Sequence, residues 1–334
     1  MTTIAVRTDR LRGLPWVTWR QHRLALGGAV ALLGGIGVLM LINAHAMHNA
    51  YVRLELNSCG DLRGPACQAP LSVFEHGYEG WAMLLPRFIM FIPGALGVFI
   101  GAPLVARELE TGTFRFAWTQ GTSRIKWITA KLAILGVALT ALTLGFSLLF
   151  SSWFSLWEPI MGRMSSGQAY ETAGVVFAAR TLFGFMLGAL LGTLIRRTVT
   201  AMAATAAAWL AVAWPTTIYL RPLIERPVVV PADSSVITQV GWTIDDWVQD
   251  PSGHRIGFKS AQMGDLVRQA TKDGAAGNRG SFDAWLARHH YNHWASYQPD
   301  ARFWHFQAIE ASGYLLLALL LAAATILWLR HHAA

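Results

Sequence analysis

Two histidines have the residue type and spacing for metal chemistry. His289 and His293 stand four residues apart, so that on a helix two imidazoles would share one face and could share a metal ion. No cysteine lies beside them, no glutamate completes an H-E-x-x-H arrangement, and Trp285 and Trp294 nearby are typical of a packed amphipathic surface. Zinc binding is therefore the weaker interpretation of this pair, and we assign no metal site.

A second chemically capable group is acidic. Glu108 and Glu110 follow a long apolar run and could serve acid–base chemistry or pair with basic residues. The topology argued below places them on the opposite side of a membrane from the histidines, so the two groups do not form one active site. The chain also has no Gly-Lys dipeptide and therefore no P-loop, so it does not itself hydrolyse a nucleotide.

The composition indicates a membrane protein. Of the 334 residues, 54% are hydrophobic and 14% charged, against about a quarter charged in soluble domains. The net charge is +8, but Lys and Arg gather at the ends of apolar runs and form no stripe interleaved with aromatic residues. An ordinary cytosolic enzyme and a nucleic-acid-binding protein are both excluded on this basis.

Six apolar stretches are long enough for a helix to cross the hydrocarbon core, which takes about 20 residues. They run over residues 24–44, 84–106, 128–150, 173–195, 199–220 and 308–329. Only Arg196, Arg197 and Thr198 separate the fourth stretch from the fifth, which predicts a tight antiparallel hairpin. The expected fold is an all-α polytopic membrane protein with six transmembrane helices.

The orientation follows from the basic residues in the short connections, which the cytoplasmic side retains. Basic residues precede the first stretch, lie in or beside the second connection, occupy the short fourth connection and follow the last stretch. They are Arg7, Arg10, Arg12, Arg20, Arg23, Arg107, Arg115, Arg124, Lys126, Lys131, Arg196, Arg197 and Arg330. The opposite short loops hold only Arg53, Arg63 and Arg163. Both termini are therefore expected inside, with the long connection 221–307 outside.

The centres of the spans are almost uncharged, which argues against an ion-coupled transporter. Arg87, Lys131, Arg180 and Glu310 lie within about two turns of a span end, where Lys and Arg can reach water and Glu310 can meet water or a basic partner. Any uphill transport must then draw its energy from another molecule.

Small residues and prolines mark two of the spans. Gly184, Gly188 and Gly192 recur every four residues, so one face of the fourth span allows close helix approach. That face could contact another subunit, but packing within the chain is the favoured interpretation. Pro86, Pro93 and Pro103 predict a kinked or broken second span.

The predicted external segments contain the two cysteines and a small subdomain. Cys59 and Cys67 share the first external loop, where an oxidising setting favours a disulfide; two unpaired thiols remain the alternative, since spacing does not decide. Residues 227–231 read as an extended segment, and 263–271 and 281–295 as helices, with Ser281 as the N-cap of the second.

Two predicted cytoplasmic segments combine aromatic and charged side chains. Ahead of the first span, Trp16, Trp19, Arg20 and Arg23 fall near one face of a helix, which predicts an interfacial elbow helix; the inner end of a long first span is the alternative. Between the second and third spans, residues 107–131 predict a short amphipathic element whose apolar residues need a partner groove or the bilayer interface to bury them.

These segments carry a resemblance to a known family. The chain resembles ABC-2 type transporter permeases, particularly those of high-GC actinobacteria. The matching residues are Trp16, Trp19, Arg20, Gln21, His22 and Arg23, then Arg107, Glu108, Glu110, Gly112, Thr113, Trp118, Thr119, Gln120, Ser123, Arg124 and Lys131, and near the last span Tyr297, Gln298, Pro299, Arg302, Phe303, Trp304, Gln307 and Glu310.

The resemblance implies a division of the chain and a role for one segment. Residues 1–23 would hold the elbow, 24–220 five spans with a coupling segment at 107–127, 221–307 an external subdomain, and 308–334 the sixth span and tail. The coupling helix would dock into the ATPase through Arg107, Glu108, Glu110, Gly112, Thr113, Phe114, Trp118, Ser123 and Arg124. Glu108 and Glu110 would pair with basic groups there or with Arg124, and solvated loop charges are the alternative.

The resemblance also implies partners and a location. A separate ABC ATPase would bind ATP and Mg²⁺, this chain would bind no cofactor, and a second permease copy would complete a homodimer or heterodimer among membrane lipids. The expected function is export of an amphiphilic drug, peptide or lipid-like molecule across a bacterial plasma membrane. A non-transporting sensor or scaffold partner of an ATPase is the alternative, and a polytopic membrane enzyme is less favoured.

Overall fold

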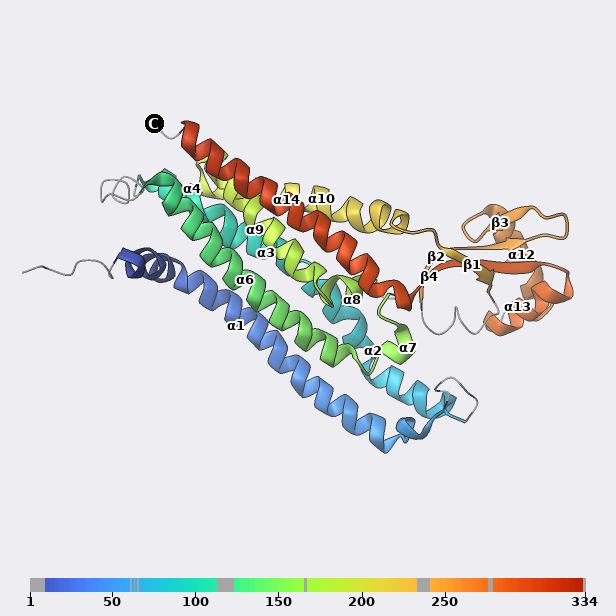
Figure 1. Cartoon of the computed structure of the whole chain (residues 1–334). Helices are drawn as coiled ribbons and strands as arrows, with labels where there is room; N and C mark the ends of the chain where they lie inside the picture. Colours follow the sequence, from blue (N-terminus) through green and yellow to red (C-terminus); the bar gives the residue numbers. More distant parts are fainter. Residues whose placement is uncertain are drawn as a thin grey trace, which may run out of the picture.

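The structure, a computed structural model, describes residues 10–332 apart from 61, 63, 65, 113–122, 165–166, 233–240 and 276–278. In this part of the chain, six helical segments are long and apolar enough to cross a membrane, as the sequence predicts. They form one elongated bundle, with a small sheet subdomain at one end and both ends of the chain at the other (Figure 1). We refer to these as the sheet end and the terminal end.

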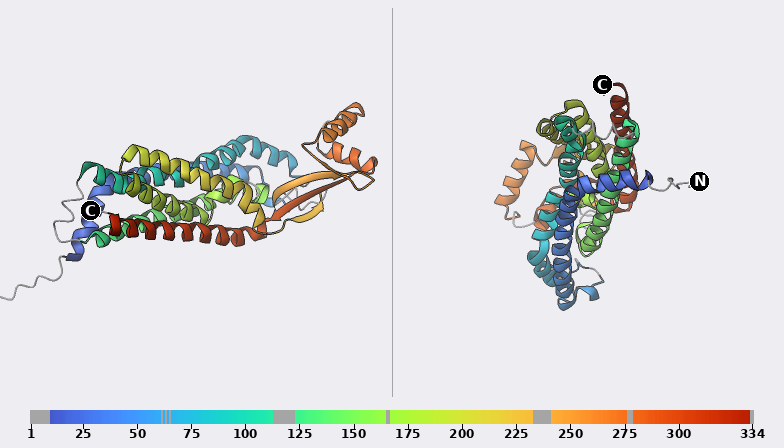
Figure 2. Two further views of the ribbon diagram at one scale, coloured as in Figure 1. Left: turned by 90° about the horizontal axis from the view of Figure 1, so that it is seen from above. Right: turned by 90° about the vertical axis from the view of Figure 1, so that its left-hand side faces the viewer.

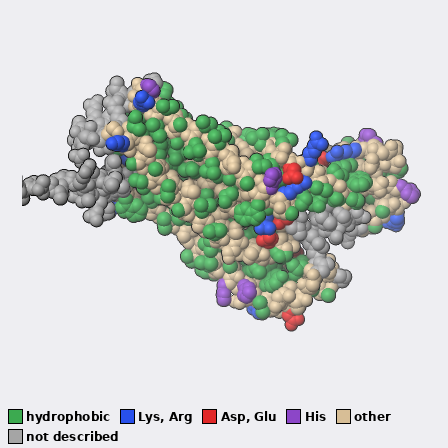
Figure 3. Space-filling model, viewed as in Figure 1, with side chains coloured by type: hydrophobic (Ala, Val, Ile, Leu, Met, Phe, Trp, Pro, Cys, Tyr) green, Lys and Arg blue, Asp and Glu red, His purple; other side chains and the backbone are tan. Residues whose placement is uncertain are grey.

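The bundle and its connections consist of helices of unequal length. They are α1 (Arg10–Arg53), α2 (Gln68–Ile89), α3 (Ile92–Leu96), η2 (Gly97–Gly101), α4 (Ala102–Thr111), α6 (Arg124–Phe154), α7 (Glu158–Met161), α8 (Gly167–Thr172), α9 (Val176–Ile195), α10 (Thr198–Pro215), η3 (Thr216–Leu220), η4 (Arg221–Leu223) and α14 (Phe303–His332), with a short helix η1 (Leu56–Ser58) after α1. Apolar side chains cover the visible face of the bundle, and charged ones gather near its ends (Figure 3). Such a surface suits a lipid environment.

The second span is a series of helices and not one rod. It starts at Gln68, well before the predicted boundary, and is interrupted at Met90 and Phe91 before η2, a π-helical turn, leads into α4. Pro93 has no N–H to bond the preceding turn, which accounts for the first interruption. The kink expected from the prolines is therefore present.

Helix α9 lies at the centre of the bundle. It is buried along most of its length and packs against α14, α4, η2, α6, α10 and α3. A helix enclosed by other helices needs no polar face, which explains why α9 is apolar on all sides apart from a few buried polar side chains such as Arg180. Arg196, in a left-handed conformation, ends α9, and α10 starts at Thr198, as the predicted tight hairpin requires.

The sheet subdomain corrects the prediction of an all-α fold. Four antiparallel strands in the order β1-β4-β2-β3 project beyond the bundle (Figure 2). They are β1 (Val228–Pro231), β2 (Gly241–Gln249), β3 (Arg255–Gly257) and β4 (Asn292–Pro299), accompanied by α12 (Ala261–Lys272) and α13 (Arg279–Arg288), and a short turn η5 (Asp300–Arg302) joins β4 to α14. The extended segment at 227–231 and the helix at 263–271 were predicted correctly in kind.

The predicted helix over 281–295 is wrong beyond Arg288. His290 adopts φ 62°, which ends the helix, and from Asn292 the chain pairs with β1 and β2. This pairing joins residues 43 to 69 positions apart and overrides the local helical pattern. Ser281 is likewise not an N-cap: α13 starts at Arg279, and the Ser281 hydroxyl donates to the carbonyl of Ala275.

Candidate functional site

At the terminal end, the end of α4 is tied to α6 by a buried ion pair. Glu108 on α4 pairs with Lys131 on α6, which is 2% exposed. The Lys131 ammonium also lies 4.4 Å from the centre of the Trp127 ring, so a cation–π contact adds to the ion pair. Glu108 thus pairs inside the chain with Lys131, seven residues beyond Arg124, which was one of the two partners expected for it.

The second carboxylate of this segment caps another helix. Glu110 Oε2 accepts hydrogen bonds from the backbone N of Thr198 at 3.0 Å and from its hydroxyl at 2.6 Å. These are groups of the first turn of α10, where a negative charge also suits the helix dipole. The last two turns of α4 therefore contact both α6 and the α9–α10 hairpin.

The connection that follows α4 is described only at its borders. Gly112 has φ 72°, a left-handed turn that glycine adopts without strain, and Ser123 caps α6 by accepting from the N–H of Lys126. Arg107 is exposed on α4. Thr113, Phe114 and Trp118 lie outside the described residues, as does the side chain of Arg124, which begins α6.

The elbow segment belongs to the first turns of α1. Figures 1 and 2 show these turns running across the bundle and not along it. Trp19, Arg20 and Arg23 are exposed there, while the side chain of Trp16 is not among the described ones. This arrangement keeps the aromatic and basic side chains at the terminal end.

The glycine face of α9 packs inside the chain, against the second span. A Cβ on Gly188 would lie 2.6 Å from the backbone N of Ala102, and one on Gly184 would lie 2.9 Å from the carbonyl oxygen of Pro93. Gly192 similarly meets the carbonyl of Ala102. Only residues without a side chain allow this approach of backbone to backbone.

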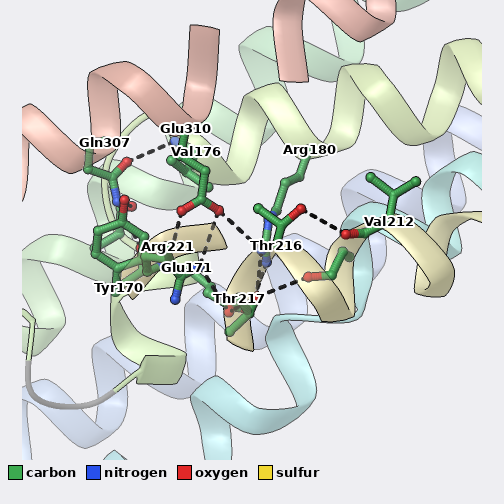
Figure 4. Close-up of polar contacts among 12 residues, drawn as sticks. Tyr170, Glu171, Val176, Arg180, Val212, Thr216, Thr217, Arg221, Gln307 and Glu310 are labelled. Carbon is green, nitrogen blue, oxygen red and sulfur yellow. Dashed lines mark hydrogen bonds and ion pairs between the residues drawn. The ribbon is translucent and has the colours of Figure 1, made fainter. Parts of the chain in front are cut away.

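At the sheet end, four charged side chains form a closed ring of ion pairs that the sequence analysis did not predict. They are Glu171 on α8, Arg180 on α9, Arg221 on η4 and Glu310 on α14, each at most 6% exposed, and we call them the ion-pair ring (Figure 4). Arg180 Nη1 lies 2.7 Å from Glu171 Oε2, and Arg180 Nη2 lies 3.2 Å from Glu310 Oε1. Arg221 closes the ring, at 3.2 Å from Glu171 and 2.9 Å from Glu310.

Two neutral side chains, Thr217 and Tyr170, also contact the ion-pair ring. The Thr217 hydroxyl lies 2.8 Å from Glu171 Oε1 and accepts from Arg180 at 2.9 Å. The ring of Tyr170 lies 4.2 Å from the Arg221 guanidinium. Burial raises the pKa of the Tyr170 phenol, so it stays neutral and leaves the charge balance of two acids and two bases unchanged.

Gln307 fixes the element that carries Glu171. Its Oε1 accepts from the N–H of Val176 at 2.9 Å, and its Nε2 donates to the carbonyls of Tyr170 and Ala173 (Figure 4). The α8–α9 corner is thereby attached to α14. Gln307 entered the sequence analysis only through the resemblance. Arg180 was expected to reach water and Glu310 to meet water or a basic partner; the structure buries both side chains and pairs Glu310 with Arg180 and Arg221.

The residues with possible metal chemistry lie in the sheet subdomain. His293 Nδ1 is 3.0 Å from Asp283 Oδ1, and His289 Nδ1 is 2.9 Å from the carbonyl of Trp285. Since α13 ends at Arg288, the two histidines do not share a helix face. Among the described residues, no three His, Cys, Asp or Glu side chains are grouped to hold a metal ion.

The loop between α1 and α2 contains the two cysteines. Cys59 and Cys67 are joined by a disulfide, which settles the alternative that the sequence left open. The bond closes the connection between α1 and α2 at the sheet end of the molecule.

Comparison with known protein families gives a match over more than half of the chain. The family described as ABC-2 membrane transporter related matches residues 29–221, from the first span to the end of the fifth. No significant match was found among curated proteins or among solved structures.

Proposed function

The chain belongs to the ABC-2 membrane transporter related family, and from this premise we propose that it is the permease subunit of an ABC exporter. It is a multi-pass membrane protein and a component of membrane transport. The proposal adds that a separate ATPase subunit binds ATP and Mg²⁺, that a second permease copy completes the passage, and that the cargo is an amphiphile. The family match over five spans is the observation that carries it.

The proposed orientation places the terminal end in the cytoplasm of a bacterium. The turn between α9 and α10, with Arg196 and Arg197, and the last turns of α14, with Arg330, lie at that end (Figure 1). Basic residues in short connections stay on the cytoplasmic side. The sheet subdomain then lies outside, together with the disulfide, in an oxidising compartment.

The proposed coupling element is the segment 107–127. Two contacts support this role: Glu108 links α4 to α6, and Glu110 links α4 to the start of α10. Movement imposed on this segment by an ATPase would therefore reach three spans directly. ATP would bind the transporter more tightly in one of its two conformations than in the other, and this difference in affinity would shift the equilibrium between them.

The test reconstitutes the chain in vesicles together with the ABC ATPase proposed as its partner, identified by co-purification. We expect ATP hydrolysis that rises with an amphiphilic cargo and ATP-dependent movement of that cargo. Glu108→Gln should lower the stimulation, because it unpairs the buried Lys131, while Asp265→Asn on the exposed helix α12 is the matched control.

Three outcomes would count against the proposal. Uphill transport by this chain without an ATPase would contradict the division of labour. Stable association with the ATPase without any cargo movement would favour a sensor or scaffold. Equal stimulation of the Glu108→Gln variant and the unmodified protein would remove the coupling role of α4.

A further inference from the structure

A groove opens beside the ion-pair ring, between α10, η3 and the interruption that separates α2 from α3. Its volume is about 180 Å³, and its walls are mainly apolar, with Phe91, Ala213, Trp214 and Ile218 among them. Phe91, Trp214 and Ile218 are exposed on the surface of the bundle. The mouth of the groove therefore faces the region that lipid chains would occupy.

Trp209, a residue of the groove wall, has a buried donor without a partner among the described residues. Trp209 lines the groove and is 3% exposed, and among the described residues its Nε1 has no hydrogen-bond partner. Its ring is held between two glycines, since a Cβ on Gly94 would lie 2.7 Å from it and one on Gly184 would lie 3.2 Å from it. An indole N–H only donates, so the missing partner is an acceptor.

The ion-pair ring decides the charge of a suitable ligand. Glu171 and Arg180 line the same groove, but each already has partners of opposite charge within the ring. A ligand with a full charge would find no free counter-charge at this depth and would lose its hydration there. A neutral acceptor does not have this disadvantage.

We propose that the groove binds a neutral amphiphile, whose carbonyl oxygen accepts a hydrogen bond from Trp209 Nε1 and whose alkyl chain lies between Phe91 and Ile218. Ester and amide carbonyls fit this description. The site is argued from the geometry of this chain alone; its use as the entrance for a transported cargo rests on the proposed function.

The experiment uses the purified full chain in detergent and a monoacylglycerol with a photoreactive group in its alkyl chain. After irradiation, mass spectrometry should find the label on residues 209–218 and near Phe91. Trp209→Phe keeps the aromatic ring but removes the donor, so we expect affinity to fall by about threefold to tenfold, the effect of one hydrogen bond.

A second variant tests the groove independently of the hydrogen bond. Ala213→Trp should fill the groove and abolish labelling there, whereas Ile309→Trp, on the other side of the ring, should not. A cooperative thermal unfolding transition in each variant checks that the variant is folded. Unchanged labelling of both Trp209→Phe and Ala213→Trp would overturn the proposal.

Charged probes test the electrostatic argument. An alkyl sulfonate and an alkyltrimethylammonium with the same photoreactive chain should label the groove several times less than the neutral ester; equal labelling would overturn the proposed ligand class. If phosphatidylcholine displaces the monoacylglycerol, the site is assigned to a bilayer lipid. If the monoacylglycerol stays bound, the site is assigned to a single-chain molecule. Loss of binding with intact ATPase coupling would reject this inference alone and leave the proposed function standing.

Discussion

At the scale of single residues, each charge in the ion-pair ring depends on the others. Glu310 holds Arg221 through both carboxylate oxygens, at 2.9 and 3.1 Å, and also holds Arg180. Glu310→Gln leaves two buried guanidinium groups with one carboxylate, so we expect the free energy of unfolding to fall by about 3–5 kcal/mol. Equilibrium unfolding in a mixed detergent–lipid system measures this change.

The matched control is an ion pair nearer the surface. Glu225 pairs with Arg302 at 2.7 Å, and both side chains are at least a quarter exposed. Glu225→Gln should cost about 1 kcal/mol or less, because solvent screens the pair. Equal losses in the two variants would mean that the buried ring contributes no more than a surface contact.

The cap that Glu110 provides predicts a local effect. Glu110→Ala leaves the Thr198 N–H without its acceptor, so the first turn of α10 should open more often. Hydrogen exchange followed by mass spectrometry should then be faster at residues 198–202, and Glu79→Ala on the exposed side of α2 should leave this region unchanged. Unaltered exchange at 198–202 would show that the first turn of α10 does not depend on this cap.

At the scale of elements, the contact between α9 and the second span sets the packing. Gly188→Ala would bring a methyl group to 2.6 Å from the Ala102 backbone, so the helices must separate. We expect a loss of about 1–3 kcal/mol from overpacking. A Cβ on Gly145 of α6 would have no neighbour within 4 Å, so Gly145→Ala should instead raise the free energy of unfolding by about 0.4–1 kcal/mol. A change of the same sign in both variants would contradict the packing argument.

The disulfide joins two elements at the sheet end. Its two cysteines are 8 residues apart in the sequence. Closing a loop of this size should stabilise the fold by about 2.5 kcal/mol, because it lowers the conformational entropy of the unfolded chain. The double variant Cys59→Ser, Cys67→Ser should unfold earlier than the oxidised protein by this amount, and the unmodified protein treated with a reductant should behave in the same way. A reductant-insensitive unfolding curve would contradict this expectation.

At the scale of the whole molecule, the proposed orientation makes a labelling prediction. In a background without Cys59 and Cys67, Lys272→Cys in the sheet subdomain should react with an impermeant maleimide in intact cells. Arg330→Cys at the terminal end should react only after the membrane is permeabilised. The reverse pattern would place the sheet subdomain in the cytoplasm.

How much of this architecture the sequence predicts depends on the range of the interactions. The six spans and the tight turn at Arg196 follow from local hydropathy and are confirmed. The pairing of Val228 with Tyr297 depends on residues far apart, so a helix was predicted where β4 lies. Local patterns carry no information about such a register.

The polar contacts show the same limit. Gly112 takes a left-handed turn and Ser123 caps α6, both of which depend on neighbouring residues only. The ion-pair ring, in contrast, joins charges from four separate elements, and the sequence indicated only that Glu310 could meet a basic partner. Distant partners of this kind are not determined by spacing along the sequence.

The glycine contact has a mechanical consequence. Because α9 touches the second span backbone to backbone, the two cannot slide past each other without a clash, and we expect them to move as one rigid lever. A 20-residue helix is about 30 Å long, so this lever extends from Glu108 and Glu110 to the level of Arg180. A tilt of α9 and the second span at one face of the membrane would then displace the ion-pair ring near the other face. The two helical segments would bend at residues outside their contact.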